Sequence, residues 1–138
     1  MSGVIIGVES TAHTFSFGLV TEGGIPRKSY SALYRPEEGG IHPREAADHH
    51  SKLASELISR LMEEENLTST DVKAIAYSQG PGLGPCLRIG ANVSRALSEQ
   101  WGIPLVGVNH CVAHIEIGRN QTGCIDPVLL YVSGGNTQ

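Results

Sequence analysis

VIIGVES, at residues 4–10, is a short, mostly β-branched apolar run, which predicts a buried strand. The run TFSFGLVTEGG at 14–24 alternates apolar with polar residues and ends in a glycine pair, as does a strand that enters a turn. RKSYSALY at 27–34 is a weaker strand signal. Together the three runs predict an antiparallel meander.

A helix is predicted to follow the meander. Pro36 and the stretch EGGIHPREA interrupt the strand pattern, and Pro43 followed by acidic Glu45 suits the first turn of a helix. We therefore expect a helix of about six turns over residues 43–65, with one apolar face. The residues that recur on this face at spacings of three and four are Ala46, His50, Leu53, Ala54, Leu57, Ile58 and Leu61.

Strands and helices alternate in the second half of the chain. A strand is predicted over 72–78, a helix over 86–101 and a buried strand over 103–108. Asn109 can cap a short helix, and the run DPVLLYVSGG at 126–135 predicts a last strand that ends in a glycine turn. Antiparallel strands followed by this alternation predict an α/β fold, with a mixed sheet and helices on its faces.

Composition limits the class of protein. The chain has 138 residues, which suits one domain. Its formal net charge is −4, and a negatively charged protein surface binds the negatively charged nucleic-acid backbone poorly. Three cysteines without a CxxC pair argue against a disulfide scaffold and fit a reducing compartment. No basic region precedes the first apolar run, so no signal peptide is expected, and no apolar stretch approaches the roughly 20 residues that span a bilayer.

The stretch GVNHCVAHIEIGR at 107–119 holds the most specific candidate for chemistry. His110 and His114 would lie one turn apart on one face of the short helix, at the carboxyl end of a strand, where open α/β sheets bind their ligands. Their imidazoles are suited to a zinc or iron ion, although two partly exposed polar residues would show the same spacing. A zinc protease would need Glu after the first histidine, and this position holds Cys111.

Glycine-rich turns offer further candidates. GPGLGP at 80–85 lacks the GK[ST] of a Walker loop and the full GxGxxG of a dinucleotide-binding loop. Its small residues would either admit a phosphate to the N-terminus of the following helix or allow a tightly packed turn. VSGGNT at 132–137 and GVESTAHT at 7–14 follow strands, and two such turns from one sheet would face one nucleotide unless they are ordinary hairpins. His49 and His50 point about 100° apart on a helix and are interpreted as surface or packing residues.

Several of these motifs closely resemble one family. They are GVESTAHT, EGGIHPREAADHH, QGPGLGPCLRIG, GVNHCVAHIEIGR and LLYVSGGNTQ, and they span nearly the whole chain. The family is the tRNA threonylcarbamoyladenosine transferases of the archaeal and eukaryotic KEOPS type, formerly called sialoglycoprotein endopeptidases. The resemblance implies an RNase H-like lobe of the actin/Hsp70/sugar-kinase (ASKHA) fold. Residues 1–138 would form the N-terminal lobe alone, and the second lobe of the family is absent from the sequence.

The resemblance also implies an activity. Family members transfer threonylcarbamoyl from threonylcarbamoyl-AMP to N6 of adenosine 37 in tRNAs that read ANN codons. They bind Fe or Zn, here through His110, His114 and Tyr131, together with an aspartate from the second lobe. The implied partners are threonylcarbamoyl-AMP or ATP, tRNA held mainly by the full complex, and other KEOPS subunits including a small kinase. The implied location is the cytoplasm, and no membrane is among the implied partners.

The remaining site residues are carried over from the matching motifs. Tyr131, Ser133, Gly134, Gly135 and Asn136 would bind the substrate, and Thr11 would join them. Glu9 and His13 are the candidate catalytic residues of the first hairpin, where Ser10 also lies. The attacking amine comes from the tRNA base, so no protein nucleophile is expected.

Two alternatives remain open from the sequence. The chain would instead be a non-catalytic interaction lobe or scaffold of KEOPS if the helices over 43–65 and 86–101 serve mainly to bind another subunit. A metalloprotease is disfavoured by Cys111. As a fragment, the chain is expected to bind metal weakly and to have no transferase activity alone.

Overall fold

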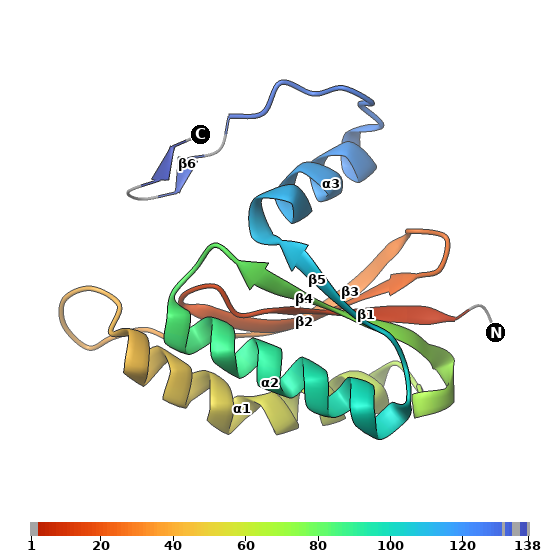
Figure 1. Ribbon diagram of the computed structural model, residues 1–138, viewed down its shortest axis with the longest axis horizontal. Coiled ribbons are helices and arrows are strands. Elements are labelled where there is room, and N and C mark those ends of the chain that lie inside the picture. Colours follow the sequence, from red (N-terminus) through yellow and green to blue (C-terminus); the bar gives the residue numbers. More distant parts are fainter. Residues whose placement is uncertain (1–2, 131, 134–135, 138) are drawn as a thin grey trace.

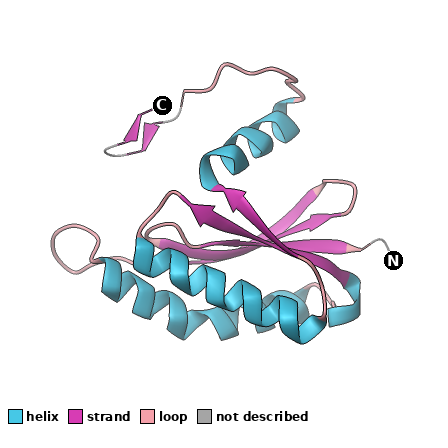
Figure 2. Ribbon diagram, viewed as in Figure 1, coloured by secondary structure: helices cyan, strands magenta, loops and turns pink. Residues whose placement is uncertain are grey.

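The computed structural model describes residues 3–130, 132–133 and 136–137. Three strands come first, and helices and strands then alternate as far as α3 (Figures 1 and 2). In chain order the elements are β1 (Val4–Glu9), β2 (Thr14–Thr21), β3 (Pro26–Leu33), α1 (Pro43–Glu64), the short 3-10 helix η1 (Ser69–Asp71), β4 (Val72–Gly80), α2 (Gly84–Trp101), β5 (Leu105–Asn109), α3 (His110–Thr122), β6 (Val132–Ser133) and β7 (Asn136–Thr137).

Five strands form one mixed sheet in the order β3-β2-β1-β4-β5. The first three pair antiparallel, with Val8 opposite Phe17, which confirms the predicted meander. β4 and β5 join parallel to β1, so the carboxyl ends of β1, β4 and β5 meet at one edge. Alternate residues of β1 are buried, as expected for a strand with one face toward the core and the other partly exposed.

α1 and α2 cover one face of the sheet and enclose the core (Figure 1). The predicted apolar face of α1 is confirmed, because Ala46, His50, Ala54, Leu57 and Leu61 are all buried. The rings of Phe15 and Phe17 on β2 meet edge to face, 5.4 Å apart, beneath this helix layer. α2 is capped by Gly102, which follows Trp101 and whose left-handed backbone suits a residue without a side chain.

α3 lies on the other side of the sheet from α1 and α2 (Figure 1). None of its thirteen residues, all of which are described, is buried. No helix among the described residues has the length and apolar character needed to cross a membrane.

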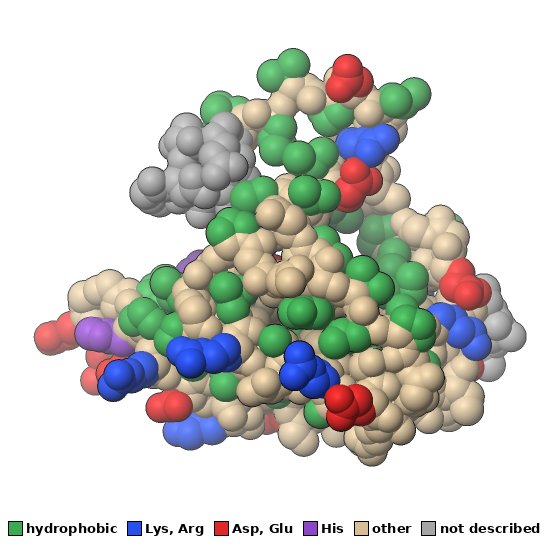
Figure 3. All heavy atoms as spheres, in the orientation of Figure 1, with side chains coloured by type: hydrophobic (Ala, Val, Ile, Leu, Met, Phe, Trp, Pro, Cys, Tyr) green, Lys and Arg blue, Asp and Glu red, His purple; other side chains and the backbone are tan. Residues whose placement is uncertain are grey.

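The predicted last strand over 126–135 is wrong as a member of the main sheet. Residues 126–130 form no strand, and within the described part of the chain β6 pairs only with β7, in a separate two-stranded sheet. Although this run is apolar, Val128 is 102% exposed and Leu130 is 76% exposed. α3 leads the chain away from the edge strand β5, and hydrophobic side chains gather on this part of the surface (Figure 3). Apolar character alone indicates a strand without indicating which sheet it joins.

Candidate functional site

The carboxyl ends of the parallel strands bring together two distant parts of the chain. Glu9 is the last residue of β1, and His110 follows directly after β5 as the first residue of α3. Although 101 positions separate them, His110 Nδ1 lies 3.0 Å from Glu9 Oε2. The site therefore lies at the sheet edge where open α/β folds bind ligands.

Asn109 fixes where α3 begins, as the sequence predicted. Its side-chain Oδ1 accepts hydrogen bonds from the backbone amides of Cys111, at 2.9 Å, and Val112, at 3.3 Å. These are amides of the first turn, which have no partner within the helix. The cap starts the helix immediately after β5, so His110 and His114 lie one turn apart on one face.

The two histidines lie on one face of α3, as predicted, and the structure brings their rings together. His110 Nε2 and His114 Nε2 lie 3.1 Å apart, with the rings nearly perpendicular. The side chain of His110 is 17% exposed, whereas His114 is exposed. We call these two residues and Glu9 the Glu9–His110–His114 cluster.

The Glu9 carboxylate is held at both oxygens. Oε1 accepts the Thr11 amide at 2.6 Å, and Oε2 lies against His110. Burial alone would raise the pKa of Glu9, but the hydrogen bonds from Thr11 and His110 outweigh it and hold the pKa below its ordinary value. The carboxylate is thus ionised at neutral pH and can only accept, so His110 Nδ1 must carry a proton.

This arrangement suits a metal ion. In the tautomer with its proton on Nδ1, the Nε2 atom of His110 faces His114 Nε2 as a nitrogen donor. Two nitrogen ligands about 2.1 Å from one ion lie roughly 3.0–3.4 Å apart, which matches the observed 3.1 Å. A carboxylate on the remote nitrogen is the usual partner of a metal-bound histidine. The same separation also suits an N–H···N hydrogen bond between the rings. Within the described residues, no group of three or more His, Cys, Asp or Glu side chains is placed to hold a metal ion.

The other predicted residues of the first hairpin are divided between two environments. Thr11 is buried and contacts Glu9 through its amide. His13 is exposed, and its Nδ1 bonds Thr14 Oγ1 at 2.9 Å. Ser10 is buried, with its amide on Ser78 Oγ. Thr11 therefore belongs beside the cluster, whereas the side chain of His13 bonds its own neighbour in the chain, Thr14.

The turn GPGLGP is tightly packed, which favours a packing role over a phosphate site at the N-terminus of α2. Leu83 donates its amide to Thr11 O at 2.7 Å. A Cβ atom on Gly82 would lie 2.6 Å from the same oxygen, which leaves no room for a side chain. The small residue thus lets the loop before α2 approach the turn that follows Glu9.

The second predicted turn is not part of the main sheet. Ser133 pairs with Asn136 between β6 and β7, so the expectation of two turns from one sheet is wrong. Tyr131, Gly134 and Gly135 lie outside the described residues, as do the side chains of Ser133 and Asn136. Their predicted roles in binding substrate and metal stay predictions.

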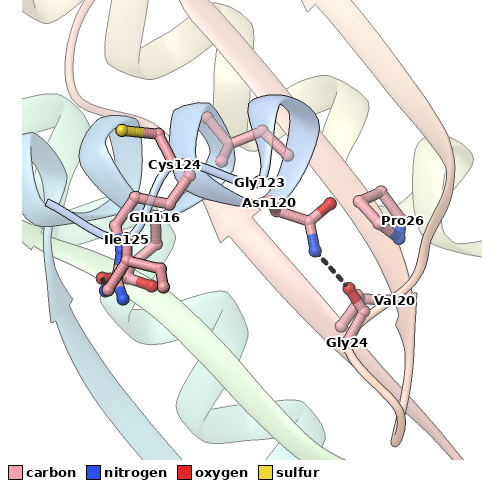
Figure 4. Close-up of a pocket in the computed structure, with 10 residues that line it drawn as sticks. Val20, Gly24, Pro26, Glu116, Asn120, Gly123, Cys124 and Ile125 are labelled. Carbon is pink, nitrogen blue, oxygen red and sulfur yellow. Dashed lines mark hydrogen bonds and ion pairs between the residues drawn. The ribbon is translucent and has the colours of Figure 1, made fainter. Parts of the chain in front are cut away.

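A separate cleft of about 520 Å³ lies between α3 and the turn that joins β2 to β3. Figure 4 shows Asn120 pointing toward Gly24, where its Nδ2 donates to the carbonyl oxygen at 2.9 Å. Apolar side chains such as Val20 and Ile117 line much of the remainder. None of the cluster residues lines this cleft, so the two features are distinct.

Comparison with known sequences shows to which family the chain belongs. Residues 27–138 match the tRNA N6-adenosine threonylcarbamoyltransferase family, TsaD. The chain belongs to this family. It is 56% identical over 134 residues to the tRNA N6-adenosine threonylcarbamoyltransferase of Pyrobaculum calidifontis, covering 97% of the chain and 40% of the relative. It is 53% identical over 137 residues to a probable bifunctional tRNA threonylcarbamoyladenosine biosynthesis protein of Methanosarcina barkeri, covering 97% of the chain and 25% of the relative. The chain thus spans less than half the length of these relatives.

Solved structures confirm the predicted fold. YeaZ from Pseudomonas aeruginosa superimposes with a TM-score of 0.68 at 17% identity, over 99% of this chain and 63% of that one. T. thermophilus RuvC, in complex with a Holliday junction substrate, does so with a TM-score of 0.52 at 11% identity, over 90% and 81%. At these identities the likeness concerns the fold alone, which is the RNase H-like α/β fold expected for a lobe of the ASKHA class.

Proposed function

We propose that the chain is the N-terminal part of an enzyme that transfers threonylcarbamoyl from threonylcarbamoyl-AMP to N6 of adenosine 37 in ANN-decoding tRNAs. Membership of the transferase family supports the reaction, and the span of 40% of the Pyrobaculum relative supports a partial chain. The observation that carries the proposal is the Glu9–His110–His114 cluster, because it supplies oriented nitrogen donors at the ligand-binding edge of the sheet.

The proposed metal is one Fe or Zn ion, held by His110 and His114, with Tyr131 as a further ligand. When bound, such an ion supplies a Lewis acid and a template for a carbonyl or phosphate oxygen. Glu9 then serves as a positioning residue, since it touches His110 rather than the reacting atoms. The Thr11 amide holds the second Glu9 oxygen and keeps the carboxylate in place.

The remaining site residues have roles in substrate binding in this proposal. Backbone amides at Ser133, Gly134, Gly135 and Asn136 cradle the adenylate or the carbamoyl group, as amides in such turns bind anions. Thr11 borders the site, and His13 stays a candidate catalytic residue. The tRNA amine is the nucleophile, so no serine or cysteine of the chain forms a covalent intermediate.

We propose a cytoplasmic complex of the KEOPS type around this chain, with a small kinase and ATP among its partners. The name of the Methanosarcina relative supports a second function linked to this family, because it describes a bifunctional protein. The net charge of −4 disfavours strong tRNA binding by this chain alone, which supports partners that provide most of the tRNA-binding surface.

A chimeric protein tests the proposed activity. The 138 residues would replace the matching N-terminal segment of the Pyrobaculum calidifontis transferase, and modification of an ANN-decoding tRNA would be measured with the partner subunits of that organism. We expect threonylcarbamoylated tRNA, and its loss when both His110 and His114 are changed to Ala. Full activity of the double variant would assign the chain to a scaffold role.

A further inference from the structure

We propose that His50 is a positioning residue for the Glu9–His110 pair and acts on it through the turn between β1 and β2. The inference rests on the proposed function for its relevance to the reaction. We call residues 10–13 the β1–β2 turn.

The backbone of the β1–β2 turn is held from several elements. Three successive carbonyl oxygens accept hydrogen bonds: Thr11 O from the Leu83 amide at 2.7 Å, Ala12 O from His50 Nε2 at 2.8 Å, and His13 O from the Tyr34 amide at 2.7 Å. These donors come from the loop before α2, from α1 and from the residue that follows β3. The turn is thus fixed against three parts of the fold.

His50 provides the one side chain among these three donors. It is fully buried on the apolar face of α1 and packs against Phe15, with ring centroids 5.5 Å apart. A leucine would fill such a position in an ordinary helix face, and a buried imidazole costs free energy unless it is hydrogen-bonded. The bond to Ala12 O therefore explains why a polar side chain lies in this core.

The contacts define one tautomer of His50. A carbonyl oxygen can only accept, so Nε2 carries the proton. Burial lowers the pKa of His50, which keeps the ring neutral and makes Nδ1 an acceptor. Nδ1 lies 3.2 Å from His49 Nδ1, which consequently donates. His50 thus holds Ala12 in a fixed orientation, because its own ring is held on both sides.

The β1–β2 turn transmits this constraint to the cluster. Thr11 directly precedes Ala12, and its amide donates to Glu9 Oε1 at 2.6 Å. The other Glu9 oxygen meets His110 Nδ1. Loss of the bond to Ala12 O frees the middle of the turn, so the Thr11 amide would hold Glu9 Oε1 less firmly.

Two substitutions of His50 separate positioning from core packing. His50→Gln retains an amide donor near the position of Nε2, whereas His50→Leu retains only the apolar volume. Amide hydrogen exchange would be followed by NMR in the metal-free 138-residue chain. We expect the Thr11 amide to exchange about tenfold faster in His50→Leu than in His50→Gln, as the loss of one buried hydrogen bond allows.

The Ile75 amide, which donates to Pro104 O at 2.9 Å within the core, is the internal reference and should exchange equally in both variants. Equal protection of Thr11 in the two variants, or equal loss at Thr11 and Ile75, would overturn the proposal. If His50→Leu does not fold, His50→Met takes its place. Failure of both to fold, beside a folded His50→Gln, would also overturn it, because the bond to Ala12 O would then be needed by the whole fold rather than by the turn alone.

A zinc titration of the same proteins links the turn to the cluster. We expect about tenfold weaker zinc binding in His50→Leu and little change in His50→Gln. A tenfold loss is the smaller end of the range, about 10–100-fold, that is typical when a residue that orients a metal ligand is changed. Unchanged zinc affinity in a His50→Leu protein that binds zinc would overturn the link to the cluster. If the unaltered chain binds no zinc through its histidines, the proposed metal site fails, while the metal-free exchange still decides the role of His50 in the turn.

Discussion

The two sides of the central sheet differ sharply in how firmly they are attached. α1 and α2 bury ten residues between them, whereas α3 on the other side buries none of its thirteen. The Glu9–His110–His114 cluster lies where these parts meet, since Glu9 belongs to the sheet and both histidines belong to α3. A firmly held carboxylate therefore orients a histidine on a loosely attached helix, which a shared ligand would then fix.

The largest expected contrast is between the two helix layers. Leu61 on α1 is fully buried, whereas Ile117 on α3 is 45% exposed. Leu61→Ala should lower the free energy of unfolding by about 2–5 kcal/mol, because it leaves a cavity in the core. Ile117→Ala should change it by less than about 0.5 kcal/mol. Urea denaturation of both variants measures the difference, and equal losses would remove the distinction between the layers.

The next contrast lies within one loop. Gly82→Ala places a Cβ atom against Thr11 O, so it should lower the free energy of unfolding by about 1–3 kcal/mol. Gly84→Ala is the matched control, because no atom lies within 4 Å of its added Cβ. This change should be neutral. A Gly82→Ala protein as stable as the control would show that the loop does not press on the β1–β2 turn.

The cap of α3 should have a smaller and local effect. Asn109→Ala removes the acceptor for the Cys111 and Val112 amides and should cost about 1 kcal/mol of helix stability. Asn109→Asp keeps an acceptor and should cost far less. Hydrogen exchange at these amides checks the prediction. Faster exchange in the core strands as well would mean that α3 is coupled to the sheet more firmly than its burial indicates.

The dependence of stability on pH gives the smallest expected effect. The pKa of His50 in the folded chain lies below its ordinary value of 6.5, so the unfolded chain binds more protons between these two values. The contribution of the neutral ring is complete above about pH 6.5 and is lost as the pH falls below it. Thermal unfolding between pH 8 and 5 should show a shallower slope for His50→Gln. A slope remains, because burial also lowers the pKa of His49.

Local sequence patterns predicted the elements better than their assembly. The strand alternation gave the meander, and the HxxxH spacing with Asn109 gave the facing histidines of α3. Glu9 was expected to be catalytic, but its contact with His110 across 101 positions could not be found without the parallel pairing of β1, β4 and β5. The role of His50 was also missed, because spacing shows that it faces the core without showing which carbonyl it meets.

Zinc binding by the 138-residue chain, titrated under anaerobic conditions, tests the central claim most directly. The comparison needs the unaltered chain, the His110→Ala/His114→Ala double variant and Glu9→Gln. The account predicts one bound ion that is lost in the double variant, and affinity about 10–100-fold weaker in Glu9→Gln, because Glu9 orients His110. Equal binding by the unaltered chain and the double variant, or no binding by an unaltered chain in which α3 is folded, would contradict it.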